Sequence, residues 1–160
     1  MRELLAVEGG LTPLSSKTHI TYQLYIPEGI DVLEIEFAYN PKTLDDKEAS
    51  KPLIEEAIRK YVDPALQGVY SQQWGKFHPL QNLLTLSVDD PQGFRGSAHR
   101  HPNHQRHILS LHAASPGFFA GQVGEGVWKV TISVHCVVTP ECRYRLRIRE
   151  GGENHEMASV

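Results

Sequence analysis

The sequence predicts a mainly all-β protein, an antiparallel β-sandwich that carries one helix. Three observations indicate this fold. Several short segments alternate apolar and polar residues, glycine and proline separate these segments, and no strand–helix–strand rhythm is present. Period-two alternation is typical of strands that bury one face, and two sheets of such strands pack face to face in a sandwich.

The expected strands alternate most clearly near both ends of the chain. Residues 19–26 and 32–39 each place four apolar side chains on one face. Further strands are expected at residues 2–7, 82–88, 107–112, 128–138 and 144–148. We expect the last two to pair as an antiparallel hairpin around Thr139, Pro140 and Glu141, with Cys136 opposite Cys142 as two thiols.

The period changes to that of a helix between residues 51 and 63, where six apolar residues form one helical stripe. Ser50 is the expected N-cap, and Pro64 closes the far end. We expect the stripe to cover one end of a sheet, because a lone helix must bury its apolar side within its own domain. Residues 65–81 are expected to form a loop, with Trp74 and Phe77 against the body of the protein.

Length and composition favour one domain over residues 1–150, followed by a flexible tail over 151–160. A formal net charge of −3 gives no global attraction to nucleic acid or to an anionic membrane. The opening residues MRELLAVEGG hold too short an apolar run for a signal peptide or a membrane span, and two cysteines are too few for a disulfide framework. We therefore expect a cytoplasmic protein.

A histidine-rich stretch begins at His99 and continues through His101, His104 and His107 to His112. Three or four imidazoles can hold zinc or a similar divalent ion, so the first four of these histidines are candidate metal ligands. Interleaved arginines weigh against this hypothesis, and no familiar metal-binding spacing is present.

The same region also predicts a surface for a small polar ligand such as a sugar. Its members are Arg95, His99, Arg100, His101 and Phe118, which combine cations, imidazoles and an aromatic ring. The sequence contains no G-x-S-x-G nucleophile motif and no glycine-rich phosphate loop. It therefore favours a binding protein over an enzyme.

Four arginines, Arg143, Arg145, Arg147 and Arg149, alternate along the last expected strand. Such a row of cations could bind phosphates or a polyanion. Opposite charges on a neighbouring strand offer a better explanation, because Glu34 and Glu36 face outward on the 32–39 strand and each cross-strand pair contributes roughly 0.2–1 kcal/mol. We favour pairing with those glutamates.

Several motifs together suggest a family: DDPQGFRG at residues 89–96, ASPGF at 114–118 with Gly121, GVW at 126–128, and IPEGIDVLEIEF at 26–37. They resemble the DP-x-G-x-x-RG, A-[ST]-PG-[YF] and G-x-W pattern of the bacterial domain that precedes the PHP-type phosphoesterase domain in carbaryl-hydrolase-like (CehA/McbA-type) metallohydrolases. The resemblance covers most of residues 19–149. It implies a jelly-roll-like accessory domain whose glycines serve turns with unusual backbone angles and whose Trp128 anchors the core.

In the resembling family the metal ligands lie in the hydrolase domain, so no catalytic residue is carried over to this chain. The expected function is a noncatalytic module that binds a small polar ligand or a protein, such as a separately encoded PHP-type metallohydrolase. One alternative is a divalent-metal-binding protein or metal-dependent hydrolase that uses the histidines between 99 and 112. Another is a structural domain that forms a homodimer through an exposed sheet edge. No cofactor is expected unless zinc binds the histidines.

Overall fold

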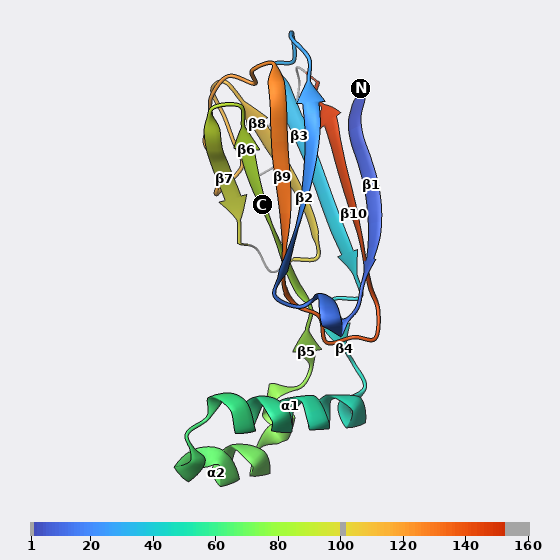
Figure 1. Cartoon of the computed structure of the whole chain (residues 1–160), viewed down its shortest axis with the longest axis vertical. Helices are drawn as coiled ribbons and strands as arrows, with labels where there is room; N and C mark the ends of the chain where they lie inside the picture. Colours follow the sequence, from blue (N-terminus) through green and yellow to red (C-terminus); the bar gives the residue numbers. More distant parts are fainter. Residues whose placement is uncertain (1, 100–101, 153–160) are drawn as a thin grey trace.

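The computed structural model describes residues 2–99 and 102–152, and it confirms the antiparallel β-sandwich (Figure 1). Two four-stranded sheets pack face to face. The first sheet contains, in order, β1 (Glu3–Leu11), β10 (Cys142–Glu150), β3 (Val32–Asn40) and β8 (His104–Ser110). The second contains β2 (Thr18–Ile26), β9 (Gly126–Cys136), β6 (Leu83–Asp90) and β7 (Gly93–Ala98).

The strand order is that of a jelly roll. Counted along the chain without the two short strands described below, the first sheet has the order first, eighth, third, sixth, and the second has the order second, seventh, fourth, fifth. The chain thus crosses repeatedly from one sheet to the other, as in the double-sheet folds built from two Greek keys. This arrangement agrees with the jelly-roll architecture expected from the resemblance.

The predicted hairpin of the last two strands is wrong. β9 pairs with β2 and β6 in the second sheet, whereas β10 pairs with β1 and β3 in the first. The connection around Pro140 therefore crosses between the sheets. Cys136 lies opposite Leu83, Cys142 lies opposite Leu11, and both thiols are free. Alternation along a strand predicts which side chains face inward but does not identify the neighbouring strand.

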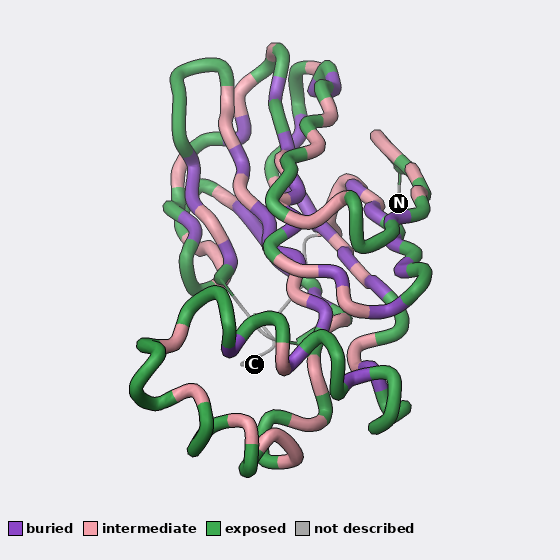
Figure 2. Tube along the Cα trace, turned by 60° about the horizontal axis from the view of Figure 1, so that its bottom comes forward, coloured by how far each residue is buried: buried purple, intermediate pink, exposed green. Residues whose placement is uncertain are grey.

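The core lies between the two sheets, and the inward-facing rows supply it. The largest buried side chains include Trp128, Tyr39 and Phe37. In Figure 2 the buried positions concentrate on the strands, whereas most of the helical segment is exposed or intermediate. Trp128 is 1% exposed, which confirms that it anchors the core.

A helical insertion, joined by a short two-stranded stalk, lies beyond one end of the sandwich, between β3 and β6 (Figure 1). The stalk pairs β4 (Thr43–Leu44) with β5 (Leu80–Gln81). The insertion between the two stalk strands contains α1 (Lys47–Tyr61), α2 (Gln67–Gln72) and short 3₁₀ turns at Pro64–Leu66 and Trp74–Phe77. The segment predicted as a loop therefore contains helical turns. Elsewhere, a 3₁₀ turn at Pro13–Ser15 joins β1 to β2.

The expected N-cap at Ser50 is wrong, because the helix begins earlier, at Lys47. Asp46 is the N-cap, and its carboxylate accepts a hydrogen bond of 3.1 Å from the Ala49 amide. Ser50 is buried inside the first turns instead, where its hydroxyl donates to the Asp46 carbonyl. Both residue types can cap a helix, so the sequence alone did not distinguish them.

Residues 111–124 form a strap that closes one side of the sandwich. The Ser115 amide donates to the Ile108 carbonyl of β8, and the Phe119 amide donates to the Arg95 carbonyl of β7. The strap thus joins the edge strands of both sheets, while β1 and β2 remain as edges on the other side. None of the described helices is long and apolar enough to cross a membrane. Residues 153–160 of the predicted tail lie outside the described residues.

Candidate binding surface

An apolar groove of about 430 Å³ lies where the helical insertion meets the end of the sandwich. One wall is the apolar stripe of α1, and the facing wall comes from α2 and the 3₁₀ turn that follows it. Its base is formed by the stalk and the end of β9. The lining residues are Leu53, Ile54, Ala57, Ile58, Tyr61, Val62, Tyr70, Phe77, Leu80, Cys136 and Val138.

The apolar stripe of α1 is only partly covered. Ile54 and Ile58 are 3% and 5% exposed, whereas Leu53 and Tyr61 are 39% and 68% exposed. Residues four apart lie on the same face of a helix, so the inner row packs inward while the neighbouring row borders the groove. The α1 helix contacts mainly α2, the 3₁₀ turn at Trp74–Phe77 and β4, so the stripe is buried within the insertion instead of over the end of a sheet, and part of it remains open.

Exposed apolar side chains gather on the insertion. Of the twelve large apolar residues that are exposed in the described part of the chain, six belong to this segment: Leu53, Tyr61, Leu66, Val69, Tyr70 and Phe77. Tyr70 and Phe77 stack with their ring centroids 6.2 Å apart. Contiguous exposed apolar surface on a globular domain marks interaction sites, whereas isolated apolar residues need no explanation.

Lysines border the groove at Tyr61. Lys17 Nζ lies 3.3 Å from the Tyr61 hydroxyl, and the Lys60 ammonium lies 5.5 Å from the ring centroid. The hydrogen bond and charge of Lys17, followed by the charge of Lys60, lower the pKa of Tyr61. Two cations, Lys17 and Lys60, therefore lie at the exposed end of the groove, where they can pair with acidic groups.

The buried amide of Asn82 fixes the base of the insertion on the sandwich. Its Nδ2 donates to the Pro41 carbonyl at 3.0 Å and to the Thr139 hydroxyl at 2.8 Å, and its Oδ1 accepts from the Val138 amide at 2.7 Å. Asn82 thus ties the stalk to the β9–β10 connection. The groove wall that includes Val138 is held in place by these bonds.

Two members of the predicted ligand surface, Arg95 and Phe118, are buried. Arg95 is 5% exposed and Phe118 is 8% exposed. The Arg95 guanidinium donates to the Asp90 carboxylate and to the carbonyls of Phe119, Gly121 and Gln122, with donor–acceptor distances of 2.5 to 3.1 Å. Its charge is paired by Asp90 of β6 and its remaining donors are bound by strap carbonyls, so it joins the strap to the sheet instead of facing a ligand.

Two of the four candidate metal ligands, His104 and His107, lie on opposite faces of β8. His104 projects outward from β8, with 69% of its side chain exposed, whereas His107 is buried against the Phe118 ring at 4.9 Å. Imidazoles on opposite faces of a strand cannot coordinate the same ion. Within residues 2–99 and 102–152, no three histidine, cysteine or carboxylate side chains are grouped to hold a metal; Arg100 and His101 lie outside these residues.

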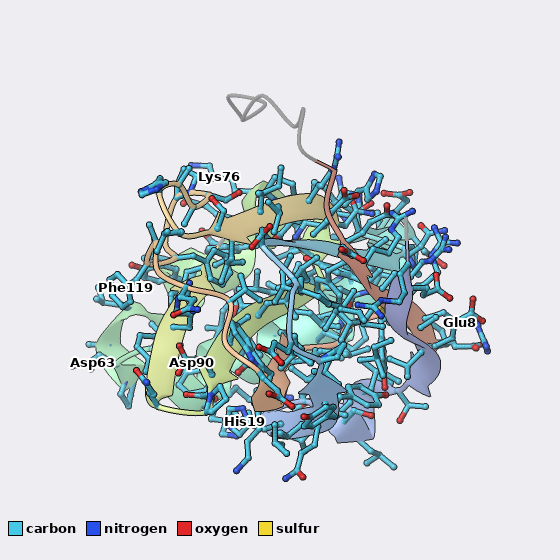
Figure 3. All side chains as sticks on the ribbon, turned by 90° about the horizontal axis from the view of Figure 1, so that it is seen from above. Glu8, His19, Asp63, Lys76, Asp90 and Phe119 are labelled. Atoms are coloured by element: carbon cyan, nitrogen blue, oxygen red, sulfur yellow. The ribbon has the colours of Figure 1, made fainter. Side chains whose placement is uncertain are left out.

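His99 instead lies near His19 and His135, a proximity that was not predicted from the sequence. His19 Nδ1 lies 3.0 Å from the Ser133 hydroxyl, and His135 Nε2 lies 2.7 Å from the Thr85 hydroxyl, on the outer face of the second sheet. Burial, followed by the charges of His99 and His19, lowers the pKa of His135. Figure 3 shows His19 on a different side of the molecule from Glu8 and Phe119.

The arginine row pairs with glutamates, as favoured from the sequence. Arg149 lies 2.8 Å from Glu36 and 3.4 Å from Glu34, and Arg147 lies 2.6 Å from Glu3 of β1. These arginine–glutamate ion pairs lie on the outer face of the first sheet. The polyanion interpretation is not needed to explain Arg147 and Arg149.

Comparison with protein-family models gave no match to this chain, and comparison with curated proteins gave no similar sequence. The resemblance to the domain that precedes PHP-type hydrolases therefore rests on the quoted motifs and stays a prediction.

Proposed function

We propose that this chain is a noncatalytic accessory module and that the apolar groove of its insertion receives a segment of a partner protein. The observation that carries the proposal is the gathering of half of the exposed large apolar side chains on this insertion. The groove is lined almost entirely by apolar side chains, which suits docking of an apolar segment more than chemistry on a substrate.

The partner segment has a defined chemistry. Its apolar side chains fill the groove beside Leu53 and Tyr61, and its carboxylates lie near Lys17 and Lys60 at the rim. An amphipathic helix with an acidic flank meets both conditions. A separately encoded PHP-type metallohydrolase, acting in the cytoplasm, is the partner that the motif resemblance suggests.

Co-purification of the full chain with such a hydrolase, encoded beside it, tests the proposal. Leu53→Glu places a charge in the groove, and Val69→Glu is the matched control because Val69 is 54% exposed on the same insertion but does not line the groove. We expect the parent protein and Val69→Glu to retain the hydrolase and Leu53→Glu to lose it. Equal retention by both variants would exclude the groove as the binding surface.

Sedimentation at two protein concentrations separates the homodimer from the proposed complex. A concentration-dependent dimer that Leu53→Glu abolishes would mean that the groove joins two copies of this chain, and the proposal of a different partner would then be wrong. A monomer at both concentrations is the expected result.

A further inference from the structure

The outer face of the first sheet carries a ladder of charges that stops at one position. Cross-strand register places Arg149 beside Glu34 and Arg147 beside Glu36. The next residue on the same face of β3 is Ala38, which lies between Arg145 and His104. Two successive positions of β3 thus supply a carboxylate, and the third supplies a methyl group.

Because of this gap, the positive charge of Arg145 is only weakly balanced by carboxylates. Among the described residues, Glu36 is the one carboxylate within 4.0 Å of its guanidinium, at 3.7 Å, and that same carboxylate already pairs with Arg149 at 2.8 Å. By contrast, Glu34 lies 2.9 Å from Arg106 and 3.4 Å from Arg149. The positive charge of the ladder is therefore least balanced where Ala38 replaces a carboxylate.

A cavity of about 290 Å³ occupies this gap. Arg143 and Arg145 border it from β10, His104 and Asn103 from the start of β8, and Asn40 from the end of β3. The guanidinium groups, the imidazole and the Asn40 amide can donate hydrogen bonds to an oxyanion, whereas the Asn103 amide already donates to the Tyr39 carbonyl at 2.8 Å. The cavity shares no residue with the apolar groove.

Carboxylates near the cavity balance only part of its charge. Glu8 of β1 lines the cavity, opposite Arg145 in register, and forms no ion pair within 4.0 Å of it in the described part of the chain. Glu141 pairs with Arg143 at 3.1 Å, but both side chains are more than half exposed, so this pair is weak. Figure 3 shows Glu8 at the edge of the molecule.

We propose that this cavity binds a compact oxyanion, a carboxylate or a phosphate, whose oxygens take the position that a third glutamate of β3 would occupy. Arg145 supplies the principal contact, because a guanidinium fork matches both kinds of oxyanion. Arg143 and His104 contact the remaining oxygens. The site is independent of the proposed partner-binding function.

Amide chemical shifts of the full-length protein test the proposal during titration with sodium phosphate or sodium succinate, with sodium chloride at matched ionic strength as the reference. We expect saturable shifts confined to residues 38–40, 103–104 and 143–145 with at least one of the two anions. Saturation by phosphate alone identifies a phosphate ligand, and saturation by succinate alone identifies a carboxylate ligand. Absence of saturation with both, or the same shifts with chloride, would overturn the proposal.

Two variants in which glutamate replaces an alanine distinguish binding at this cavity from a general effect of added negative charge. Ala38→Glu supplies the missing carboxylate within the chain, so we expect anion binding to weaken at least about tenfold. Ala6→Glu adds the same charge to the same face, but beside Arg147, which Glu3 already pairs. Binding by Ala6→Glu should stay within about twofold of the parent protein, since the cavity is untouched. Equal weakening by both variants would overturn the proposal.

A second pair of variants keeps the test valid if Ala38→Glu fails to fold. Arg145→Gln removes the principal donor and should weaken anion binding about tenfold, whereas Arg147→Gln should leave it within about twofold. Unchanged binding in Arg145→Gln would overturn the assignment of the site to this cavity.

Discussion

Gly96 and Gly117 approach each other so closely that neither position has room for a side chain. A Cβ on Gly96 would lie 2.5 Å from the Gly117 carbonyl oxygen, and a Cβ on Gly117 would overlap the carbonyl oxygen of Ser97. Both glycines have positive φ, +131° and +92°. This contact joins the strap to β7.

Alanine at either position should destabilise the protein. We expect Gly96→Ala and Gly117→Ala each to lower the free energy of unfolding by about 2–4 kcal/mol, because a positive φ is strained and the backbone must also move apart. Urea unfolding followed by tryptophan fluorescence measures the change. Gly124→Ala is the control: nothing lies within 4 Å of its Cβ, so we expect a change within about 0.5 kcal/mol. Equal stability of all three variants would contradict the close approach.

Arg95 should be among the most sensitive positions of the chain. Arg95→Met would leave Asp90 Oδ2 and three strap carbonyls without the guanidinium donor and the partly buried Asp90 charge without its cation, so we expect a loss of about 3–5 kcal/mol in the free energy of unfolding. Arg143→Gln, which removes an exposed ion pair, should cost less than about 1 kcal/mol. If Arg95→Met unfolds at the same urea concentration as the parent protein, the buried network is not stabilising.

The fold was largely predictable because apolar alternation follows the inward faces of both sheets. Strand pairing was less accessible: Trp128 to Val138 and Tyr144 to Ile148 alternate equally well whether they pair or lie in different sheets. The strand Gly93–Ala98 was missed because its two glycines and Arg95 do not show an apolar face.

The candidate sites were less predictable than the fold. Arg95 looked like a surface cation because arginine is rarely buried unless paired, and its partners lie up to 27 residues away in the strap. The α1 stripe was visible in the sequence, but the opposite wall at Tyr70 and Phe77 was not, since that short segment has no clear helical period. The gap at Ala38 becomes visible only when the register across three strands is known.

His135 should titrate below the ordinary histidine range. Burial and the charges of His99 and His19 lower the pKa of His135, so the folded state binds fewer protons than the unfolded chain as pH falls through about 6.5. Its contribution to stability is therefore complete above that pH and declines below it. Imidazole NMR titration measures the midpoint directly. His99→Gln should raise the midpoint by removing a nearby cation, whereas His112→Gln, which is not among the causes of the shift, should leave it unchanged.

The two thiols should react at different rates. Burial raises the pKa of both Cys136 and Cys142, which slows attack on a disulfide reagent at neutral pH. Cys142 is 0% exposed in the core, whereas Cys136 lines the apolar groove. We expect Cys136 to react first with 5,5′-dithiobis(2-nitrobenzoic acid) and Cys142 to react only on unfolding. Folded Cys136→Ser should therefore release almost no thiolate signal, and rapid release would contradict the burial of Cys142.

Ala38→Glu should stabilise the protein in the absence of any anion. A glutamate at this position continues the row of Glu34 and Glu36 between Arg145 and His104, and such a cross-strand pair contributes about 0.2–1 kcal/mol to the free energy of unfolding. Urea unfolding at low and high salt measures the gain, which should shrink at high salt because these groups are partly exposed. Ala6→Glu should give no comparable gain, since Glu3 already occupies Arg147 at 2.6 Å. A loss of stability in Ala38→Glu would mean that Arg145 needs no carboxylate, and the gap in the ladder would then carry no excess positive charge for a ligand to balance.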